Sequence, residues 1–133
     1  MERDALDVEV RRAEADDRLA VRRQLDAAVL AVDDLDERLA AGDVLVAEAD
    51  GRVVGTIVLS PRENSEGAHV DAIAVRRRRR GRGVGRTLIH RAREDYGPLA
   101  AEFDAGVRPF YESLEFAIEP TDADDDRYRG VLK

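Results

Sequence analysis

The chain has 133 residues, 44% of them hydrophobic and 38% charged, which suffices for one hydrophobic core but not for two catalytic domains. It has no apolar run near the roughly 20 residues that cross a bilayer and no signal-type apolar stretch at its start. The absence of cysteine excludes disulfides, thiolate metal sites and an acyl-cysteine intermediate. We therefore expect a single domain over residues 1–133, a cytoplasmic location and no membrane partner.

Charge is distributed unevenly along the chain. The 29 acids and 22 bases give a net charge of −7, and Lys133 is the only lysine. Seven of the bases are arginines between Arg76 and Arg86, so the remaining 15 bases face all 29 acids. An acidic chain nearly free of lysine resembles proteins of a salt-rich cytoplasm, such as that of a halophilic archaeon. The acidic body argues against nucleic acid as a partner, whereas the arginine cluster suits a phosphate-bearing ligand.

The first part of the chain predicts one strand and two helices. We expect a strand over 6–12. The acidic residues at 14–17 favour the start of a helix that runs to about Leu30. A second helix is expected over 33–41, with Gly42 as its end.

The clearest hairpin signal follows. Asp50-Gly51 lies between the apolar runs 44–49 and 52–59, and Asp-Gly favours a type I′ turn. These two runs are therefore expected to be antiparallel neighbours. A further strand is predicted over 68–75.

The second half predicts a strand, a glycine-rich loop and a helix, followed by smaller elements. Helical spacing begins at Val84, and Gly97-Pro98 closes that helix. The remaining elements are a strand over 99–104, a short helix from Arg108, a strand start at 116–118, a polar turn at 121–126 and a last strand over 127–132. This order of strands and helices predicts an α/β domain with a mixed sheet.

The acids at 122–126 lack the loop spacing and the terminal glutamate of a calcium-binding hand. We expect a solvated turn there and no metal site. The residues do not decide whether two chains pair through their last strands as a homodimer.

The stretch after the strand at 68–75 alternates glycine with arginine. Glycines keep the backbone accessible where the strand turns into a helix, and the first amides of that helix lack intrahelical acceptors. Arginines at the same point add donors suited to a pyrophosphate. The spacing fits neither a P-loop nor a dinucleotide fingerprint. The residues of this expected anion site are Arg80, Gly81, Arg82, Gly83, Val84, Gly85 and Arg86.

Two segments carry a family resemblance. The Arg-x-x-Gly-x-Gly pattern of residues 80–85 resembles the acyl-CoA-binding loop of the GNAT superfamily of N-acetyltransferases. Residues 109–116, Pro-Phe-Tyr-Glu-Ser-Leu-Glu-Phe, resemble its Phe-Tyr-x-x-Leu-Gly-Phe segment. The chain departs from the family pattern at Glu115, which replaces the usual glycine, and at Asp104, where many members carry asparagine.

The resemblance implies a single-domain α/β GNAT fold, a mixed sheet of about six to seven strands flanked by about four helices. It implies an enzyme that transfers an acetyl group from acetyl-CoA, its co-substrate, to a primary amine of a small molecule or protein by direct attack in a ternary complex. A non-catalytic acyl-CoA-binding module and an RNA-binding protein using the arginine run are the alternatives. The implied cofactor-binding residues are Ile73, Ala74, Val75 and the seven residues from Arg80 to Arg86.

The resemblance also implies catalytic roles. Tyr111 would protonate the leaving thiolate, although it could instead be a core residue beside Phe110 and Phe116. The thioester carbonyl would be polarised by a backbone amide near Ala74 or Val75, where the family's fourth strand splays from the fifth.

Several residues are candidates for the base. His69 lies eleven residues before Arg80, the offset at which histone-type members carry their glutamate, and imidazole exchanges protons near neutral pH. Strand alternation predicts that His69 and Asp71 share a face with Ile73 and Val75. Asp71 would need a raised pKa or a water relay, and Glu63 and Glu66 in the preceding loop are further candidates.

Overall fold

The computed structural model describes residues 8–63, 65–121 and 126–133. Its first half comprises β1 (Glu9–Arg12), the 3-10 turn η2 (Ala15–Asp17), α1 (Arg18–Ala27), α2 (Leu35–Ala41), β2 (Val44–Ala49), β3 (Arg52–Pro61) and β4 (Ala68–Val75). Its second half comprises η3 (Arg77–Arg79), α3 (Val84–Tyr96), β5 (Leu99–Asp104), η4 (Ala105–Val107), α4 (Arg108–Ser113), β6 (Ala117–Pro120) and β7 (Arg127–Leu132). The expected start of the first strand at residues 6–7 and the acids at 122–125 lie outside the described residues.

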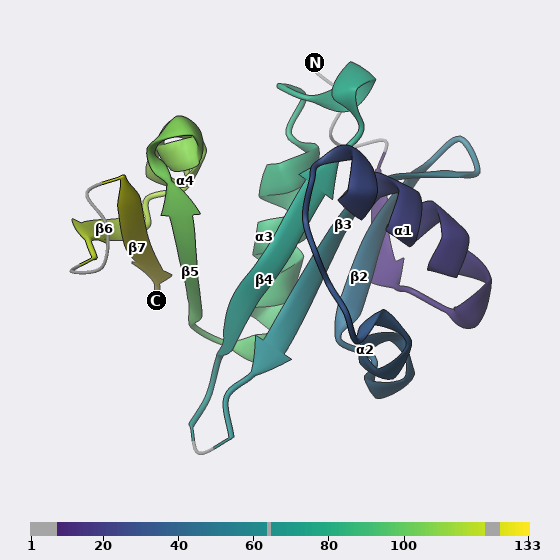
Figure 1. Ribbon diagram of the computed structural model, residues 1–133, viewed down its shortest axis with the longest axis horizontal. Coiled ribbons are helices and arrows are strands. Elements are labelled where there is room, and N and C mark those ends of the chain that lie inside the picture. Colours follow the sequence, from purple (N-terminus) through teal and green to yellow (C-terminus); the bar gives the residue numbers. More distant parts are fainter. Residues whose placement is uncertain (1–7, 64, 122–125) are drawn as a thin grey trace.

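Seven strands form one mixed sheet in the order β1-β2-β3-β4-β5-β7-β6 (Figure 1). The pair β4–β5 is parallel, and the neighbouring pairs are antiparallel. This confirms the predicted α/β class, the order of the elements and the antiparallel pairing of β2 with β3. The last strand β7 lies between β5 and β6, so two chains could pair through it only by displacing β6.

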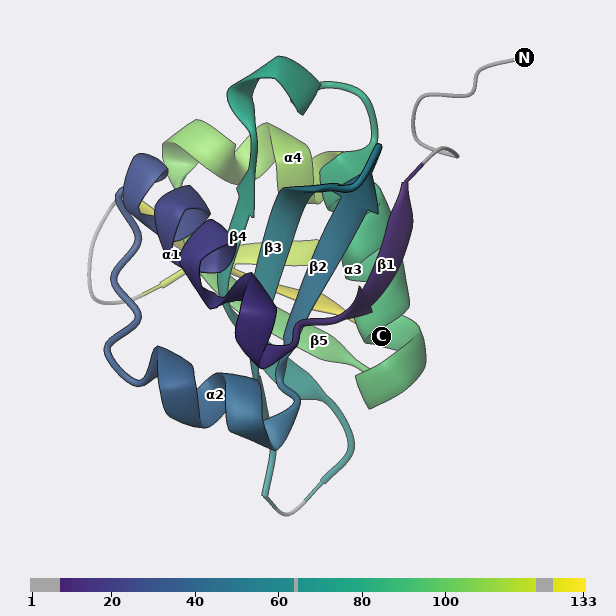
Figure 2. The ribbon, with the colours of Figure 1, turned by 90° about the vertical axis from the view of Figure 1, so that its right-hand side faces the viewer.

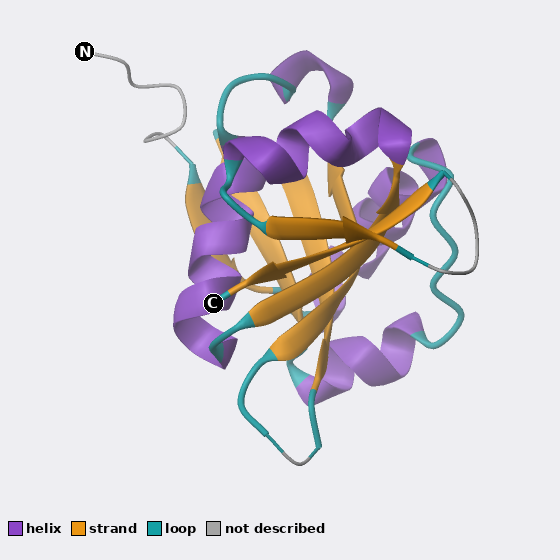
Figure 3. Ribbon diagram, turned by 90° about the vertical axis from the view of Figure 1, so that its left-hand side faces the viewer, coloured by secondary structure: helices purple, strands orange, loops and turns teal. Residues whose placement is uncertain are grey.

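Helices cover both faces of the twisted sheet (Figures 2 and 3). On one face, α1 and α2 bury Val21, Leu25 and Leu35 against the sheet. On the other face, α3 and α4 contribute Leu88 and Tyr111 to a larger apolar cluster. No helix in the described ranges is long and apolar enough to span a membrane.

The turn and helix ends follow the local chemistry of the sequence. Asp50 (φ 55°) and Gly51 (φ 77°) both adopt left-handed backbone, as a type I′ hairpin turn requires. Gly42 (φ 80°) ends α2 as predicted. The first helix, however, ends at Ala27 rather than near Leu30, because Val29 (φ 58°) turns the chain and the Leu30 amide bonds back to Leu25 O (2.9 Å).

Strand β4 departs from simple alternation. The pairing with β3 shifts between Val58 and Leu59, so that Asp71 is an extra residue in β4. Ala68 and Val70 therefore pack on the α3 side together with Ile73 and Val75, whereas Ala72 packs on the α1 side. The prediction that His69 and Asp71 share a face with Ile73 and Val75 was wrong, because this bulge reverses the alternation.

Candidate active site

The parallel strands β4 and β5 pair along only part of their length. Cα partners run from Ala68–Leu99 to Val70–Ala101. Beyond that point the segments 71–75 of β4 and 102–104 of β5 diverge toward their carboxyl ends (Figure 1). We call this divergence the β4–β5 split. Its presence agrees with the splayed strands that the family resemblance implies.

The register of β4 indicates which of its amides face the split. The Arg76 amide donates to Val54 O (2.9 Å), so Arg76 faces β3. In an antiparallel pair, successive residues face alternate edges. Ala74 therefore also faces β3, while the amides of Ile73 and Val75 face the split. The register favours these two, rather than Ala74, as donors toward a carbonyl held there.

Helix α3 begins beside the carboxyl end of β4. Gly83 (φ 88°) is its N-cap and supplies no side-chain cap. The first intrahelical bond runs from the Thr87 amide to Gly83 O (2.9 Å). The amides of residues 84–86 thus precede any intrahelical acceptor, and the helix dipole is positive at this end. This is the geometry of the predicted anion site.

The glycines of this loop serve different purposes. The left-handed backbone of Gly83 starts the helix at an angle that an L side chain rarely adopts. A Cβ at Gly85 would instead lie 2.9 Å from Phe110 Cε1. Gly85 therefore allows α4 to pack against α3, and its role is packing as well as backbone access.

Two arginines of the predicted anion site donate hydrogen bonds to backbone carbonyls of the protein. Arg80 Nε donates to Val75 O (3.3 Å), at the border of the split. Arg86 Nη2 donates to Ser113 O (3.1 Å) at the end of α4. Arg86 therefore connects α3 to α4, in addition to lying in the first turn of α3.

Tyr111 lies in the core between α4 and β5. Its side chain is 5% exposed and its ring stacks on Phe103 with centroids 4.2 Å apart. Phe110 and Phe116 contact the ring edge-on. Burial raises the pKa of Tyr111 to about 12, and no described residue forms a hydrogen bond with its hydroxyl. Tyr111 is thus a core residue that retains an unused donor.

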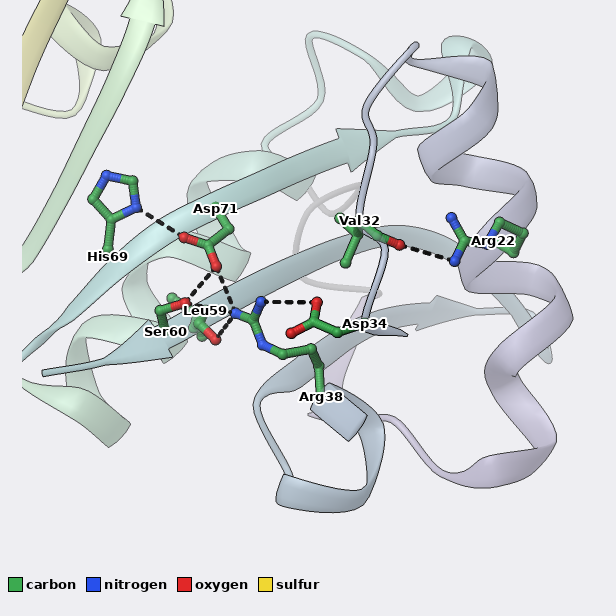
Figure 4. Close-up of polar contacts among 8 residues, drawn as sticks. All are labelled: Arg22, Val32, Asp34, Arg38, Leu59, Ser60, His69 and Asp71. Atoms are coloured by element: carbon green, nitrogen blue, oxygen red, sulfur yellow. Dashed lines mark hydrogen bonds and ion pairs between the residues drawn. The ribbon is translucent and has the colours of Figure 1, made fainter. Parts of the chain in front are cut away.

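His69 and Asp71 form a polar network on the α1–α2 side of the sheet (Figure 4). His69 Nδ1 lies 2.9 Å from Asp71 Oδ1. Asp71 Oδ2 accepts from Ser60 Oγ (2.5 Å) and from Arg38 Nη2 (2.6 Å). Arg38 also donates to the Leu59 carbonyl. The carboxylate of Asp71 is therefore fully engaged.

The hydrogen bonds of this network distinguish Asp71 from His69 as candidate bases. Burial would raise the pKa of Asp71, but the hydrogen bonds from Ser60, His69 and Arg38 outweigh it and lower that pKa. A carboxylate held ionised in this way is a poor proton acceptor. It can instead fix the tautomer of His69, leaving Nε2 as the accepting nitrogen.

The other expected residues lie elsewhere. Glu63 and Glu66 are exposed in the loop before β4, at the end of that strand opposite to the start of α3. Asp104 accepts from Arg127 (2.9 Å) at the end of β5. Glu115 (φ 67°) closes α4 in the left-handed conformation that explains the family's glycine. No spacing in the sequence marks Arg38 or Ser60, because only the fold brings these two residues to Asp71.

A family model described as an acetyltransferase (GNAT) domain matches residues 40–118. The chain belongs to the GNAT acetyltransferase family. The predicted class of enzyme, an N-acetyltransferase that uses acetyl-CoA, is confirmed by this membership. No curated protein matches the chain by sequence.

Solved structures support the GNAT fold. A putative GNAT acetyltransferase from Desulfovibrio desulfuricans is 26% identical with a TM-score of 0.73, and the match covers 95% of this chain and 98% of that one. Diaminobutyrate acetyltransferase from Paenibacillus lautus, in complex with L-2,4-diaminobutyric acid and coenzyme A, is 18% identical with a TM-score of 0.70 and 93% coverage of both chains.

N-acetylglutamate synthase from Neisseria gonorrhoeae, complexed with coenzyme A and L-arginine, has a TM-score of 0.80 at 15% identity. The match covers 95% of this chain but only 33% of the synthase. The GNAT protein therefore corresponds to about a third of that enzyme.

Proposed function

We propose that this GNAT protein acetylates a primary amine of a small molecule or protein, with the diphosphate of acetyl-CoA on the amides at the start of α3. The observation that carries the proposal is the coincidence of two features at one end of β4. The uncapped amides of residues 84–86 suit a diphosphate. The β4–β5 split begins directly after Val70 and gives a pantetheine chain a place beside β4.

Acetyl-CoA supplies the activated acetyl group as a thioester. The amides of Ile73 and Val75 face the split, so they can donate to the thioester oxygen as negative charge develops there. His69, oriented by Asp71, accepts a proton from the acceptor ammonium, so that the amine nitrogen can attack. As the C–N bond forms, the C–S bond breaks and the hydroxyl of Tyr111 protonates the departing thiolate. The acylated nitrogen releases its second proton to solvent, and the Tyr111 phenolate takes a proton back from solvent.

In this proposal the acceptor is an amine, and the lone pair of its deprotonated nitrogen attacks the carbonyl carbon of the thioester directly. The structure of diaminobutyrate acetyltransferase contains L-2,4-diaminobutyric acid, a small diamino acid. This complex supports a small amine as the acceptor of the present protein, whose chain is of similar length. We also propose that the protein works in a salt-rich cytoplasm, as its acidic, almost lysine-free composition favours.

The proposal is tested by thiol release from acetyl-CoA across a panel of primary amines. We expect amine-dependent release, reduced about 100-fold in His69→Gln. The control is His90→Gln, which changes the other histidine, exposed on α3. Absence of release with every amine would contradict the proposed activity, and an unaffected rate in His69→Gln would remove His69 as the base.

A further inference from the structure

A cavity of about 840 Å³ lies beside α1, where the β2–β3 turn and the segment after β4 meet. It is lined by α1 residues that include Gln24 and Ala27, by Val53 and by Val75. No residue from 81 to 86 lines it. The cavity is therefore distinct from the amides that start α3, although Val75 and Arg80 border both regions.

Arginines from three separate segments surround this cavity. They come from α1, from the start of β3 and from the segment after β4. The lining arginines are Arg23, Arg52, Arg76, Arg77, Arg78 and Arg80. The one acid in the lining is Asp17, and its carboxylate is already bonded to Arg11 (2.7 Å).

Among the residues that the structure describes, the lining arginines have no acidic partner of their own. Within the described ranges, no salt bridge joins any of them to a carboxylate, although neighbouring Arg79 pairs with Asp50 (3.4 Å). The chain has 29 acids that could have supplied one. Guanidinium groups gathered around a cavity repel one another unless an anion lies between them, and their planar donors match carboxylate and phosphate oxygens.

The position of the cavity indicates whether the anionic group belongs to the cofactor or to the acetyl acceptor. The amides of α3 already provide a place for the cofactor's diphosphate. The cavity lies on the α1–α2 side of the sheet, the side on which Arg38 of α2 holds Asp71 (2.6 Å) and thereby His69. Val75 lines the cavity and also faces the β4–β5 split with its amide. A ligand bound here can therefore extend toward the thioester from the side of the proposed base.

We propose that this cavity binds a carboxylate or phosphate group of the acetyl acceptor, so that the enzyme selects amines that also carry an anion. The inference rests on the proposed function and narrows its substrate class. The net charge of −7 by itself would favour a cationic acceptor. The acidic body repels anions at long range, whereas the local arginines bind them at contact.

The test compares matched amines in the thiol-release assay. One pair is lysine and cadaverine, which differ by a carboxylate, and the other is phosphoethanolamine and ethanolamine, which differ by a phosphate. We expect the wild type to favour one anionic member at least 10-fold in kcat/KM. The double variant Arg23→Gln, Arg52→Gln should lose that preference through a raised KM, and calorimetry should show weaker binding of the same anionic amine.

The control is Arg62→Gln, an exposed arginine in the loop after β3, which should retain the preference. Equal rates within both pairs in the wild type would overturn the inference and leave the transferase intact. The double variant could also bind acetyl-CoA more weakly than the wild type while the two proteins bind dephospho-CoA equally. That result would assign the cavity to the 3′-phosphate of the cofactor and would also overturn the inference. Failure with every amine would instead contradict the proposed function.

Discussion

Tyr111 combines a packed ring with an unused hydroxyl. Removing that hydroxyl leaves the ring contacts with Phe103 intact and deletes a buried donor that has no described protein partner. We expect Tyr111→Phe to lower kcat about 100-fold with little change in the free energy of unfolding. Calorimetry should give an unchanged Kd for acetyl-CoA. An undiminished kcat would show that the residue is only part of the core.

Glu115 carries a backbone conformation that costs stability. Its φ of 67° lies in the left-handed region, and the Phe116 amide bonds back to Tyr111 O (3.2 Å) to close α4. A non-glycine residue there costs about 1–2 kcal/mol. We expect Glu115→Gly to raise the free energy of unfolding by about 1 kcal/mol, measured by urea denaturation.

A matched variant should change stability in the opposite sense. Glu112→Gly places glycine inside α4, where it should destabilise by about 1 kcal/mol, and it also removes the exposed ion pair with Arg108. If Glu115→Gly is destabilising as well, the left-handed turn is not a source of strain.

The sequence predicted individual site residues, but it did not predict the hydrogen bonds that join them. The offset from Arg80 indicated His69, and Asp71 was an alternative base. Arg38 lies 33 residues from Asp71, and its contact depends on how α2 lies over the sheet. The lowered pKa of Asp71 follows from that contact, so its supporting role could be inferred only from the fold.

At the scale of elements, β4 and β5 must meet closely at one end to diverge at the other. The Ala68 amide donates to Pro98 O (3.0 Å) where the two strands begin. Gly67 (φ 107°) precedes this contact, and a Cβ there would lie 2.3 Å from the same oxygen. Only glycine permits this approach.

We therefore expect Gly67→Ala to lower the free energy of unfolding by about 2 kcal/mol or more, because it combines a backbone clash with an unfavourable φ. Thermal denaturation measures the effect. Gly106→Ala is the control, since a Cβ there meets nothing within 4 Å, and it should be nearly neutral. Equal stability of the two variants would contradict the close approach.

Element boundaries were largely predictable because turn residues mark them. Gly42, Asp50-Gly51 and Gly97 ended or joined elements as their chemistry predicts. The bulge in β4 was not predictable. Five of the six residues 70–75 are apolar, so no change of pattern marks the bulge, and only the register with β3 reveals the extra residue at Asp71.

For the whole molecule, charge is the dominant feature. The net charge of −7 implies self-repulsion that salt screens, since the Debye length falls from about 10 Å at 0.1 M to about 3 Å at 1 M. We expect 2 M KCl to stabilise the fold by about 1 kcal/mol, or about 4 °C in Tm, measured by calorimetry. A Tm that falls with added KCl would contradict adaptation to a salt-rich cytoplasm.

The position of acetyl-CoA is tested most directly by a crystal structure of the protein with this thioester bound. We expect diphosphate oxygens about 3 Å from the amide nitrogens of residues 84–86, and the thioester oxygen at a similar distance from the amide of Ile73 or Val75. A diphosphate bound away from the start of α3, or an acetyl group outside the β4–β5 split, would contradict the proposed site.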